Sequence, residues 1–545
     1  MSGQPTSENK NSLPNDIAGY AVKLVNYKGE GTDITEIVET FSLYEDLFSP
    51  ACSLELIVVD ASGLPEITPI VGEEYIVLTY RTRGFKKGKE EYPLRRRSFR
   101  IYKLSKKEEA AERQTNYVLS CIDDHLLLNE MVDLNSSYVG QNCTLAANTI
   151  FENSFIKTDE TFRPFDKYPR LYGVNTNDVK ESTNNSSYIA PGVTPFEAIT
   201  YLRDEAEHRN NLDNNSDYVF FQTYLGFHLT TLSELKAQKP QFKFVVQDGA
   251  AEESKKNEAV PKEEGDERED TTNHQTINKF QVKKTFDTLH NLGLGTYGNR
   301  VAAIDILTKK FDEKIFSYDS DYKNLNTLAT GRLTTKDSLF RYSGSTHTRY
   351  LPTELLSTNV NTGSPTGFTQ TESSYATTPY FFPVNKKNPD EKKDKMSGTI
   401  NNEDAQKRLS TIISKDPRLA NPRKKHQLLN NRISGKAILD NIIIDLVVPG
   451  NSDIKVGDTI YLYIPQTSAN LEETFYNKFF GQKDPKFLVT NVRHSYATGV
   501  TNFFTVLTVV KDSLHDEIET IMAGVNASTG KADATWPVKH MIKNT

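Results

Sequence analysis

The chain of 545 residues is poor in the residues that build disulfide frameworks and metal centres. It has three cysteines, one tryptophan and no Cys-x-x-Cys pair. So small and odd a number of cysteines argues against a disulfide framework and is typical of a protein made in a reducing compartment. Cys52 and Cys121 lie in or beside apolar runs, where a thiol acts as a small hydrophobic side chain. No Cys/His cluster has zinc-ligand spacing, so we expect neither a metal nor another cofactor.

Long apolar stretches are also missing. No run reaches the roughly 18 residues of a membrane-spanning helix. The segment Met1–Glu8 lacks the basic start and apolar core of a secretory signal, so residues 1–16 are expected to be a disordered lead-in. Aromatic residues make up 10% of the chain, which is too many for general disorder. The aromatic residues are mainly tyrosine and phenylalanine, which favour β-strands.

The net charge of −7 comes mostly from one segment. Residues 249–275 hold nine acidic against four basic side chains, a net of −5, which leaves −2 for the rest of the chain. This segment has almost no large apolar residue and lacks EF-hand spacing, so it is predicted to be a flexible, solvated loop and not a calcium site. Basic runs such as Arg95–Arg97 are scattered, and a pI of about 5.9 argues against a dedicated nucleic-acid binder.

Catalytic signatures are absent. The chain has no His-Glu-x-x-His, no Gly-x-Ser-x-Gly, no phosphate-binding loop and no Gly-x-Gly-x-x-Gly. The ten histidines are spread thinly: His125 ends the first repeat, His228 lies in the middle hairpin, and His494, which could act as a buried switch or base, is interpreted as a hydrogen-bonded structural histidine. The carboxylate pairs Asp123–Asp124 and Asp204–Glu205 are assigned to solvated surface, although the sequence leaves an acid/base pair for glycoside hydrolysis open. No residue is predicted to be catalytic, cofactor-binding or metal-binding.

The chain contains a repeated pattern of four predicted strands, with one copy near each end. Each copy has an apolar run, a strand that follows a Val-Gly-acid turn, a strand that begins with Phe, and a final apolar strand. The first copy has these at 53–60, 71–80, 99–104 and 117–123, and the second at 442–448, 456–464, 487–492 and 503–510. The order and spacing predict two copies of one strand-rich unit, the design of a scaffold with internal pseudo-symmetry.

The middle of the chain combines helices and strands. Thr194-Pro-Phe-Glu197 is a capping box with proline at the first helical position, which predicts a helix with one apolar face. The runs 218–223 and 227–232 flank Leu225-Gly226 and predict a β-hairpin. Further expected elements are short helices at 143–155 and 403–414, strands at 301–307 and 314–318, and long loops over 318–383.

These patterns predict a mainly β protein with an α+β middle, in which two similar small β-barrels flank a helix-and-hairpin region. A closed barrel removes exposed sheet edges, which suits short strands bounded by turns. The expected division is a disordered N-terminus (1–16), a first β-barrel (17–130), an α+β middle domain (131–248), an acidic flexible loop (249–275), a continuation of the middle domain with long loops (276–424), a second β-barrel (425–515) and a C-terminal tail (516–545).

Several runs resemble one known family. The second copy contains Val448-Pro-Gly-Asn451 and Val456-Gly-Asp458, and it ends in Val509-Val-Lys-Asp-Ser513. The middle adds Pro195-Phe-Glu-Ala-Ile199 and the hairpin run. Together these resemble the central baseplate hub protein of contractile-tailed bacteriophages. That family is related in fold to the N-terminal part of type VI secretion spike proteins and to phage late-control hub proteins. The resemblance covers most of residues 17–515.

The resemblance implies a structural role without enzymatic activity. Hubs of this family are homotrimers whose tandem barrels form a pseudo-sixfold ring, which joins the sixfold tail tube to the threefold central spike. The ring would contact baseplate wedge proteins and let genomic DNA pass without specific binding, in a virion tail assembled in the host cytoplasm. We expect Val71–Tyr80 and Val456–Ile464 to close the ring and residues 516–545 to contact the spike.

Two alternatives from other classes stay open. One is a tail-associated peptidoglycan hydrolase. The other is a receptor-binding tail adhesin, which would account for the Ser/Thr/Asn-rich region over residues 320–400.

Overall fold

The computed structural model describes residues 17, 19–82, 94–111, 114–156, 171–172, 182, 185–210, 213–246, 276–305, 310–318, 325–329, 376–382, 425–464, 486–498, 502–514, 524–525 and 532–533. Within these ranges the chain is mainly β with an α+β middle, as the sequence predicts. The expected disordered start (1–16), the acidic loop (249–275), the helix at 403–414 and nearly all of the tail (516–545) lie outside the described residues.

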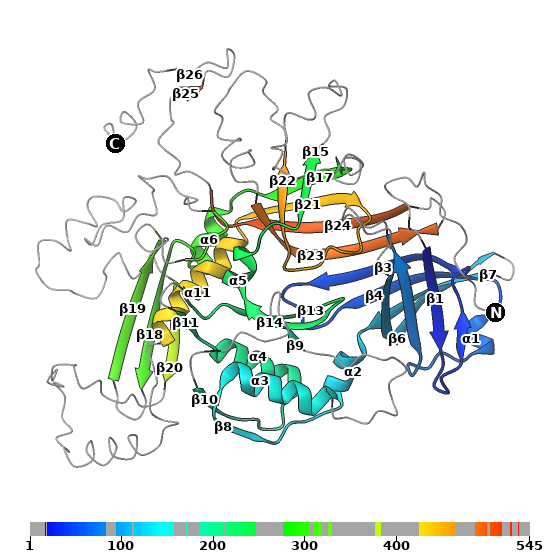
Figure 1. Cartoon of the computed structure of the whole chain (residues 1–545), viewed down its shortest axis with the longest axis horizontal. Helices are drawn as coiled ribbons and strands as arrows, with labels where there is room; N and C mark the ends of the chain where they lie inside the picture. Colours follow the sequence, from blue (N-terminus) through cyan, green and yellow to red (C-terminus); the bar gives the residue numbers. More distant parts are fainter. Residues whose placement is uncertain are drawn as a thin grey trace, which may run out of the picture.

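The first repeat occupies one end of the molecule (Figure 1). Its elements are β1 (Gly19–Val25), β2 (Gly31–Asp33), β3 (Val38–Asp46), β4 (Ser53–Asp60), α1 (Leu64–Ile67), β5 (Tyr75–Arg81), β6 (Leu94–Ala111) and β7 (Gln114–Ile122). The hydrogen-bonded order is β3–β4–β7–β6–β5–β1–β2. Strand β2 leads along the chain directly into β3, so a short connection joins the two ends of this order. Residues that alternate along the strands fill its core, among them Phe41, Leu56, Leu78, Phe99 and Leu119.

The second repeat has the same connectivity. Its strands are β15 (Phe242–Val246), β16 (Thr276–Ile277), β17 (Lys279–Lys284), β21 (Ile442–Pro449), β22 (Thr459–Tyr463), β23 (Lys486–Ala497) and β24 (Asn502–Lys511). The order runs β17–β21–β24–β23–β22–β15–β16, and Asn278 joins β16 to β17. Strand β17 therefore has the same position in the second repeat as β3 in the first: β17 pairs with β21, and β3 pairs with β4. One difference is that β15 runs parallel to β22, whereas β1 runs antiparallel to β5.

The repeat extends to the register of individual residues. In the first copy, Ile101 opposes Cys121 and a bulge separates it from the next pair, Lys103 and Ser120. In the second copy, Val489 opposes Val509, and the bulge again precedes the next pair, which is Asn491 and Thr508. All four positions are 388 residues apart between the copies. A bulge bends and twists a strand locally, so both copies bend at the same place.

The middle region packs helices against a hairpin. It contains α2 (Asp124–Glu130), β8 (Ser137–Asn142), α3 (Cys143–Phe151) with a π-helical turn over Glu152–Ile156, β9 (Leu171–Tyr172), β10 (Asn185–Ile189), α4 (Pro195–Glu205), β11 (His208–Asn210), β12 (Asp213–Asn215), β13 (Tyr218–Thr223), β14 (Gly226–Thr231) and α5 (Leu232–Ala237). The predicted capping box of Thr194 and Glu197 is confirmed at the start of α4. The predicted hairpin is confirmed as β13 and β14.

A further group of elements includes the strands β18, β19 and β20, which lie at the end of the molecule opposite to the first repeat (Figure 1). It consists of α6 (Thr288–Leu294), β18 (Gly298–Asp305), β19 (Lys310–Ser317), β20 (Ala376–Phe382) and α11 (Lys425–Leu439), with the two short strands β25 (Gly524–Val525) and β26 (Ala532–Asp533) elsewhere. The two strands predicted near 301–307 and 314–318 are confirmed as β18 and β19, which pair antiparallel. No helix within the described ranges is long and apolar enough to cross a membrane.

Candidate functional site

The two repeats meet along a shared β-ladder. Strand β3 of the first repeat pairs antiparallel with β23 of the second, from Asp46 opposite Asn491 to Thr40 opposite Ala497. The two strands lie side by side in the centre of the molecule (Figure 1). A continuous ladder of backbone hydrogen bonds fixes both the spacing and the register of the two repeats. We define the surroundings of this ladder as the repeat junction.

The hydrophobic cores exchange residues across the repeat junction. Tyr496 and Phe503 of the second repeat belong to the core of the first, where Tyr496 lies 5.5 Å from Phe41 between ring centroids. In return, Leu47 of the first repeat is buried in the core of the second, and its amide donates to the carbonyl of Thr490. Aromatic side chains of this size bury a large apolar area. Separation of the repeats would therefore expose part of each core.

The Val-Pro-Gly-Asn run forms a close contact at the repeat junction. The amide of Gly450 donates to the carbonyl of Phe503 over 2.9 Å. A β-carbon at position 450 would lie 1.8 Å from the ring of Phe503, which is far inside van der Waals contact. Only glycine lets the backbone approach this ring, so the motif serves the packing of the junction.

The residues after Gly450 bind the first repeat through buried polar contacts. The hydroxyl of Thr82 accepts from the amide of Ser452 at 3.0 Å and lies 2.7 Å from its hydroxyl oxygen. Asn451 is also buried, and its side chain accepts from the amide of Asp453. Because buried polar groups are costly without partners, these bonds specify how the loop sits on the first repeat.

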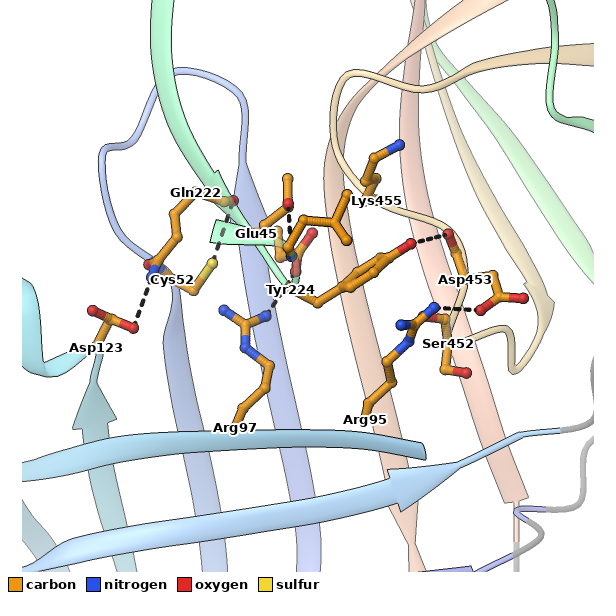
Figure 2. Close-up of polar contacts among 12 residues, drawn as sticks. Glu45, Cys52, Arg95, Arg97, Asp123, Gln222, Tyr224, Ser452, Asp453 and Lys455 are labelled. Carbon is orange, nitrogen blue, oxygen red and sulfur yellow. Dashed lines mark hydrogen bonds and ion pairs between the residues drawn. The ribbon is translucent and has the colours of Figure 1, made fainter. Parts of the chain in front are cut away.

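Arg95 connects three parts of the chain at the rim of the repeat junction. Its guanidinium forms a 2.6 Å ion pair with Asp453 and donates to the carbonyl of Ser452. The same guanidinium lies 3.8 Å from the ring centroid of Tyr224, in the turn of the middle hairpin. Figure 2 shows Arg95 and Arg97 projecting from one strand toward different partners. The cation–π contact ties the hairpin to both repeats.

A buried ion pair lies deeper in the repeat junction. Arg97 of β6 donates to Glu45 of β3 at 2.7 Å, and both side chains are almost fully buried (Figure 2). Burial raises the pKa of Glu45, and the charge and hydrogen bond of Arg97 oppose this rise. Removing one member of such a pair leaves an uncompensated buried charge, which costs about 3–5 kcal/mol. The pair therefore holds β3 and β6 together directly beside the ladder to β23.

The first strand of the middle hairpin, β13, packs between the second repeat and the middle region at the repeat junction. Side chains alternate along β13: Val219 and Phe221 lie in the core of the second repeat, whereas Tyr218 and Phe220 lie in the core of the middle region. This is the two-residue period of a strand buried on both faces. Gln222 at the end of β13 then reaches the first repeat. One strand thus contacts all three parts of the chain.

Gln222 makes a chain of buried hydrogen bonds (Figure 2). Its amide oxygen accepts from the backbone of Cys52 at 2.8 Å, and its amide nitrogen donates to Asp123 at 2.7 Å. Burial alone would raise the pKa of Asp123, but His125 and the bond from Gln222 outweigh burial and lower it. Burial raises the pKa of the Cys52 thiol to about 12, so this cysteine is no nucleophile at neutral pH.

The residues considered in the sequence for chemistry have structural contacts. His494 is buried, and its Nδ1 lies 3.2 Å from the hydroxyl of Thr505. Burial, with the charge of Arg97, lowers its pKa to about 3, so the ring stays neutral. His494 is therefore buried and close to a hydrogen-bonding partner, which agrees with its interpretation as a hydrogen-bonded histidine. His228 lies in the middle hairpin, where its Nε2 is 2.8 Å from Thr223.

The two carboxylate pairs do not converge on a common site. Asp123 caps α2, and Asp124 forms a 2.7 Å ion pair with Arg100. Asp204 accepts hydrogen bonds from Arg432 of α11. Among the described residues no group of three or more His, Cys, Asp or Glu side chains could hold a metal ion.

The strands chosen to close a ring do not have free edges. Strand β5, from the predicted segment Val71–Tyr80, pairs with β1 along one edge and with β6 along the other. Strand β22, from Val456–Ile464, lies between β15 and β23. The role of these segments in ring closure stays a prediction, and it would not use these strand edges where they pair within the chain.

Sequence reasoning also missed the roles of Arg95 and Arg97, which it read as a scattered basic run. A signal was present, because Arg95, Arg97 and Phe99 alternate with the period of a strand and Phe99 is fully buried. The partners Glu45 and Asp453 are distant in the sequence. Nothing local to the run identifies them.

Comparison with known proteins gives structural neighbours only. No protein-family model matches the chain, and no curated protein matches its sequence. The tail protein from Neisseria meningitidis MC58 aligns with 91% of this chain and 97% of its own, at 12% identity and a TM-score of 0.42. The prophage MuSo2 tail protein from Shewanella oneidensis aligns with 90% of this chain and 98% of its own, at 7% identity and a TM-score of 0.40.

A third neighbour comes from a secretion system. The E. coli c3393 protein, a type VI secretion component with structural similarity to the T4 tail proteins gp27 and gp5, aligns with 87% of this chain and 73% of its own. The identity is 9% and the TM-score is 0.32. These neighbours include phage tail proteins and a type VI secretion component.

Proposed function

We propose that the chain is a structural hub of a phage tail baseplate, a homotrimer whose two repeats per chain form a pseudo-sixfold ring. The observation that carries this proposal is the duplication itself. Both repeats have the same strand order and the same bulge, and a continuous ladder joins them. Three chains with two such repeats each present six similar modules, which is what a threefold partner needs in order to mate with a sixfold one.

The repeat junction suits this role because an adapter must hold its two modules at a fixed angle. The shared ladder and the exchanged core residues oppose movement of one repeat against the other, and the buried Glu45–Arg97 pair joins two strands of the first repeat beside that ladder. None of these contacts needs a substrate or a cofactor. The role we propose is structural and not enzymatic.

The partners of the ring follow from its symmetry. One face would bind the sixfold tail tube, the other would bind the threefold central spike through residues 516–545, and baseplate wedge proteins would surround it. Genomic DNA would pass through the lumen. Apart from the segment 249–275, the chain carries a net charge of only −2, which suits a passage in which DNA slides without sticking. The protein would reside in the virion tail baseplate after assembly in the host cytoplasm.

The mass of the purified full chain in solution tests this proposal, with class averages by negative-stain electron microscopy of the same sample. The measurement is repeated after co-expression with a central spike protein. We expect a particle of three chains of 61.6 kDa each with six peripheral densities. A monomer under both conditions would overturn the proposal, and clearance of cell walls or binding to intact cells would then decide between a hydrolase and an adhesin.

A further inference from the structure

The ladder between the repeats joins one edge of β23 to one edge of β3. The equivalent edges in the other repeat belong to β6 and β17, and within the described ranges neither has a partner strand. Strand β23 has two parts: Lys486–Leu488 pairs with β22, and the part after the bulge pairs with β3. Strand β6 is its equivalent in the first repeat. Its part Leu94–Arg100 pairs with β5, but along the part 103–109 only β7 is bonded, on one edge. The other edge of this part has no partner strand within the described ranges.

The matching acceptor edge is β17. Strands β3 and β17 can be aligned residue by residue through the strands they pair with, β4 and β21. Phe41 of β3 opposes Leu56, and Phe280 of β17 opposes Leu446. Because Leu56 and Leu446 are equivalent in the repeat, Phe41 and Phe280 are equivalent too. Strand β3 carries β4 on one edge and β23 on the other. Strand β17 carries β21 on one edge, and among the described strands its second edge is open. It lies on the far side of the second repeat from the repeat junction (Figure 1).

The exposure of equivalent residues supports a missing strand at β17. Phe41 is completely buried, and Tyr496 from the partner strand β23 packs on its ring. Phe280 occupies the same position on β17 and is 37% exposed. Leu43 is completely buried, whereas its equivalent Val282 is only partly buried. Apolar side chains at an open strand edge are unfavourable in water and typical of a surface that pairs with another chain.

We infer that residues 103–109 of β6 add as a strand to β17 of a second copy of this chain, in the register by which β23 adds to β3. This inference rests on the proposed function and locates its subunit contact. Each chain would then give one strand and receive one, which is a head-to-tail contact that closes into a ring when the rotation allows it. Backbone pairing of this kind is strand addition at an exposed sheet edge.

The internal ladder fixes the expected register between the chains. Ser495 opposes Ser42, and their hydroxyl oxygens are 3.3 Å apart. In the repeat, Ser495 corresponds to Glu108, because the bulge between Ser105 and Glu108 gives β6 one residue more than β23, and Ser42 corresponds to Gln281. Glu108 should therefore oppose Gln281 of the next chain.

A disulfide tests this register in the full chain. Opposed positions on a ladder have α-carbons about 4.5–5.5 Å apart, within the range of a disulfide. We expect the variant E108C/Q281C, mildly oxidised, to form bonds between chains and to give covalent oligomers of the native mass. The variant S42C/S495C is the internal positive control, because it should close the equivalent bond within one chain. The variant E108C/K28C, whose second cysteine lies in an exposed turn of the first repeat, is the matched negative control.

The outcomes separate this inference from the proposed function. At least tenfold more cross-linking in E108C/Q281C than in E108C/K28C supports it. A trimer in which the two variants cross-link equally overturns the register while the trimeric hub stands. A monomer with and without the spike overturns both.

A second measurement uses the concentration at which half of the protein is assembled. F280K should raise this concentration at least tenfold, whereas L289K, at an exposed leucine of α6, should not change it. Equal effects of the two variants would contradict the inference.

Discussion

The two repeats have one backbone plan but support it with different side chains. Glu74 follows the Val-Gly turn of the first repeat and accepts hydrogen bonds from the amides of Val71 and Gly72. Asp458 follows the same turn in the second repeat and binds both the amide and the ammonium group of Lys455. Both carboxylates are buried, and both carbonyls accept from the equivalent strand, at Ile101 and Val489 respectively.

The surroundings of the turn differ more than the turn itself. Gly457 packs against Phe221 and Leu235 of the middle region, whereas the nearest atom to a β-carbon at Gly72 is a backbone oxygen 3.8 Å away. The second repeat is embedded in the middle region, and the first is attached mainly through the repeat junction. The comparison teaches that a duplicated fold keeps its backbone hydrogen bonds while each copy fits its side chains to its own neighbours.

The largest effect is expected from removing Arg97, which is the buried partner of Glu45 within the first repeat. R97A leaves Glu45 buried without its counter-charge and should lower the free energy of unfolding by about 3–5 kcal/mol, measured by urea denaturation followed by circular dichroism. The double variant E45L/R97M restores apolar packing and should recover most of this loss. A double variant as unstable as R97A would contradict a charge origin of the effect.

Alanine at the glycine of each Val-Gly turn tests the difference in surroundings. Gly72 and Gly457 both have positive φ, at 99° and 83°, so alanine strains the backbone at both by about 1–2 kcal/mol. In G457A the new β-carbon also lies 3.1 Å from Leu235, which adds about 1–3 kcal/mol of overpacking. We expect G457A to be clearly less stable than G72A in urea. Equal losses would show that the middle region does not constrain the turn.

The buried His494 should make the repeat junction sensitive to acid. Its pKa is lowered to about 3 in the fold, so between pH 6.5 and pH 3 the unfolded chain binds a proton that the folded chain does not. Stability attributable to this residue is therefore present above pH 6.5 and is lost as the pH falls, by about 2 kcal/mol at pH 5. H494Q should lose less stability than the native chain between pH 7 and pH 5. Parallel losses in the two proteins would refute this role.

The smallest effect is expected at Arg95, which is the partly exposed counterpart of Arg97. Its ion pair with Asp453 is open to solvent, so R95A should cost about 1 kcal/mol or less in urea denaturation. The loss should shrink at 0.5 M NaCl, because salt screens partly exposed charges. A loss as large as that of R97A would mean that burial does not separate the two arginines.

The part of the fold that sequence predicts is the part with local signals. The Val-Gly-acid turns, the capping box at Thr194 and the Gly226 hairpin each combine a turn or cap with an apolar period, and all three are confirmed. The sequence-based division assigns residues 131–248 and 276–424 to the middle domain, and these ranges contain β15, β16 and β17. Their membership of the second repeat depends on pairing with β21 and β22, about 165–220 residues further along.

The repeat junction could not be predicted for the same physical reason. The pairing of β3 with β23 joins residues about 450 positions apart, and neither strand carries a sign of its partner. The buried pair of Glu45 and Arg97 reads as two surface charges until β3 and β6 are brought together. Gly450 was recognised as part of a motif, but its reason, the ring of Phe503, appears only in the assembled structure.

The exchange of core residues has a consequence for how the protein is made. The last strand of the first repeat ends at Ile122, yet that repeat borrows Tyr496 and Phe503 for its core. At about 5–20 residues per second, the ribosome needs roughly 20–75 s to reach Tyr496 after Ile122. During this interval the first repeat has an incomplete core and an unpaired β3 edge. A newborn chain should therefore depend on chaperones, and conditions that slow translation should favour aggregation.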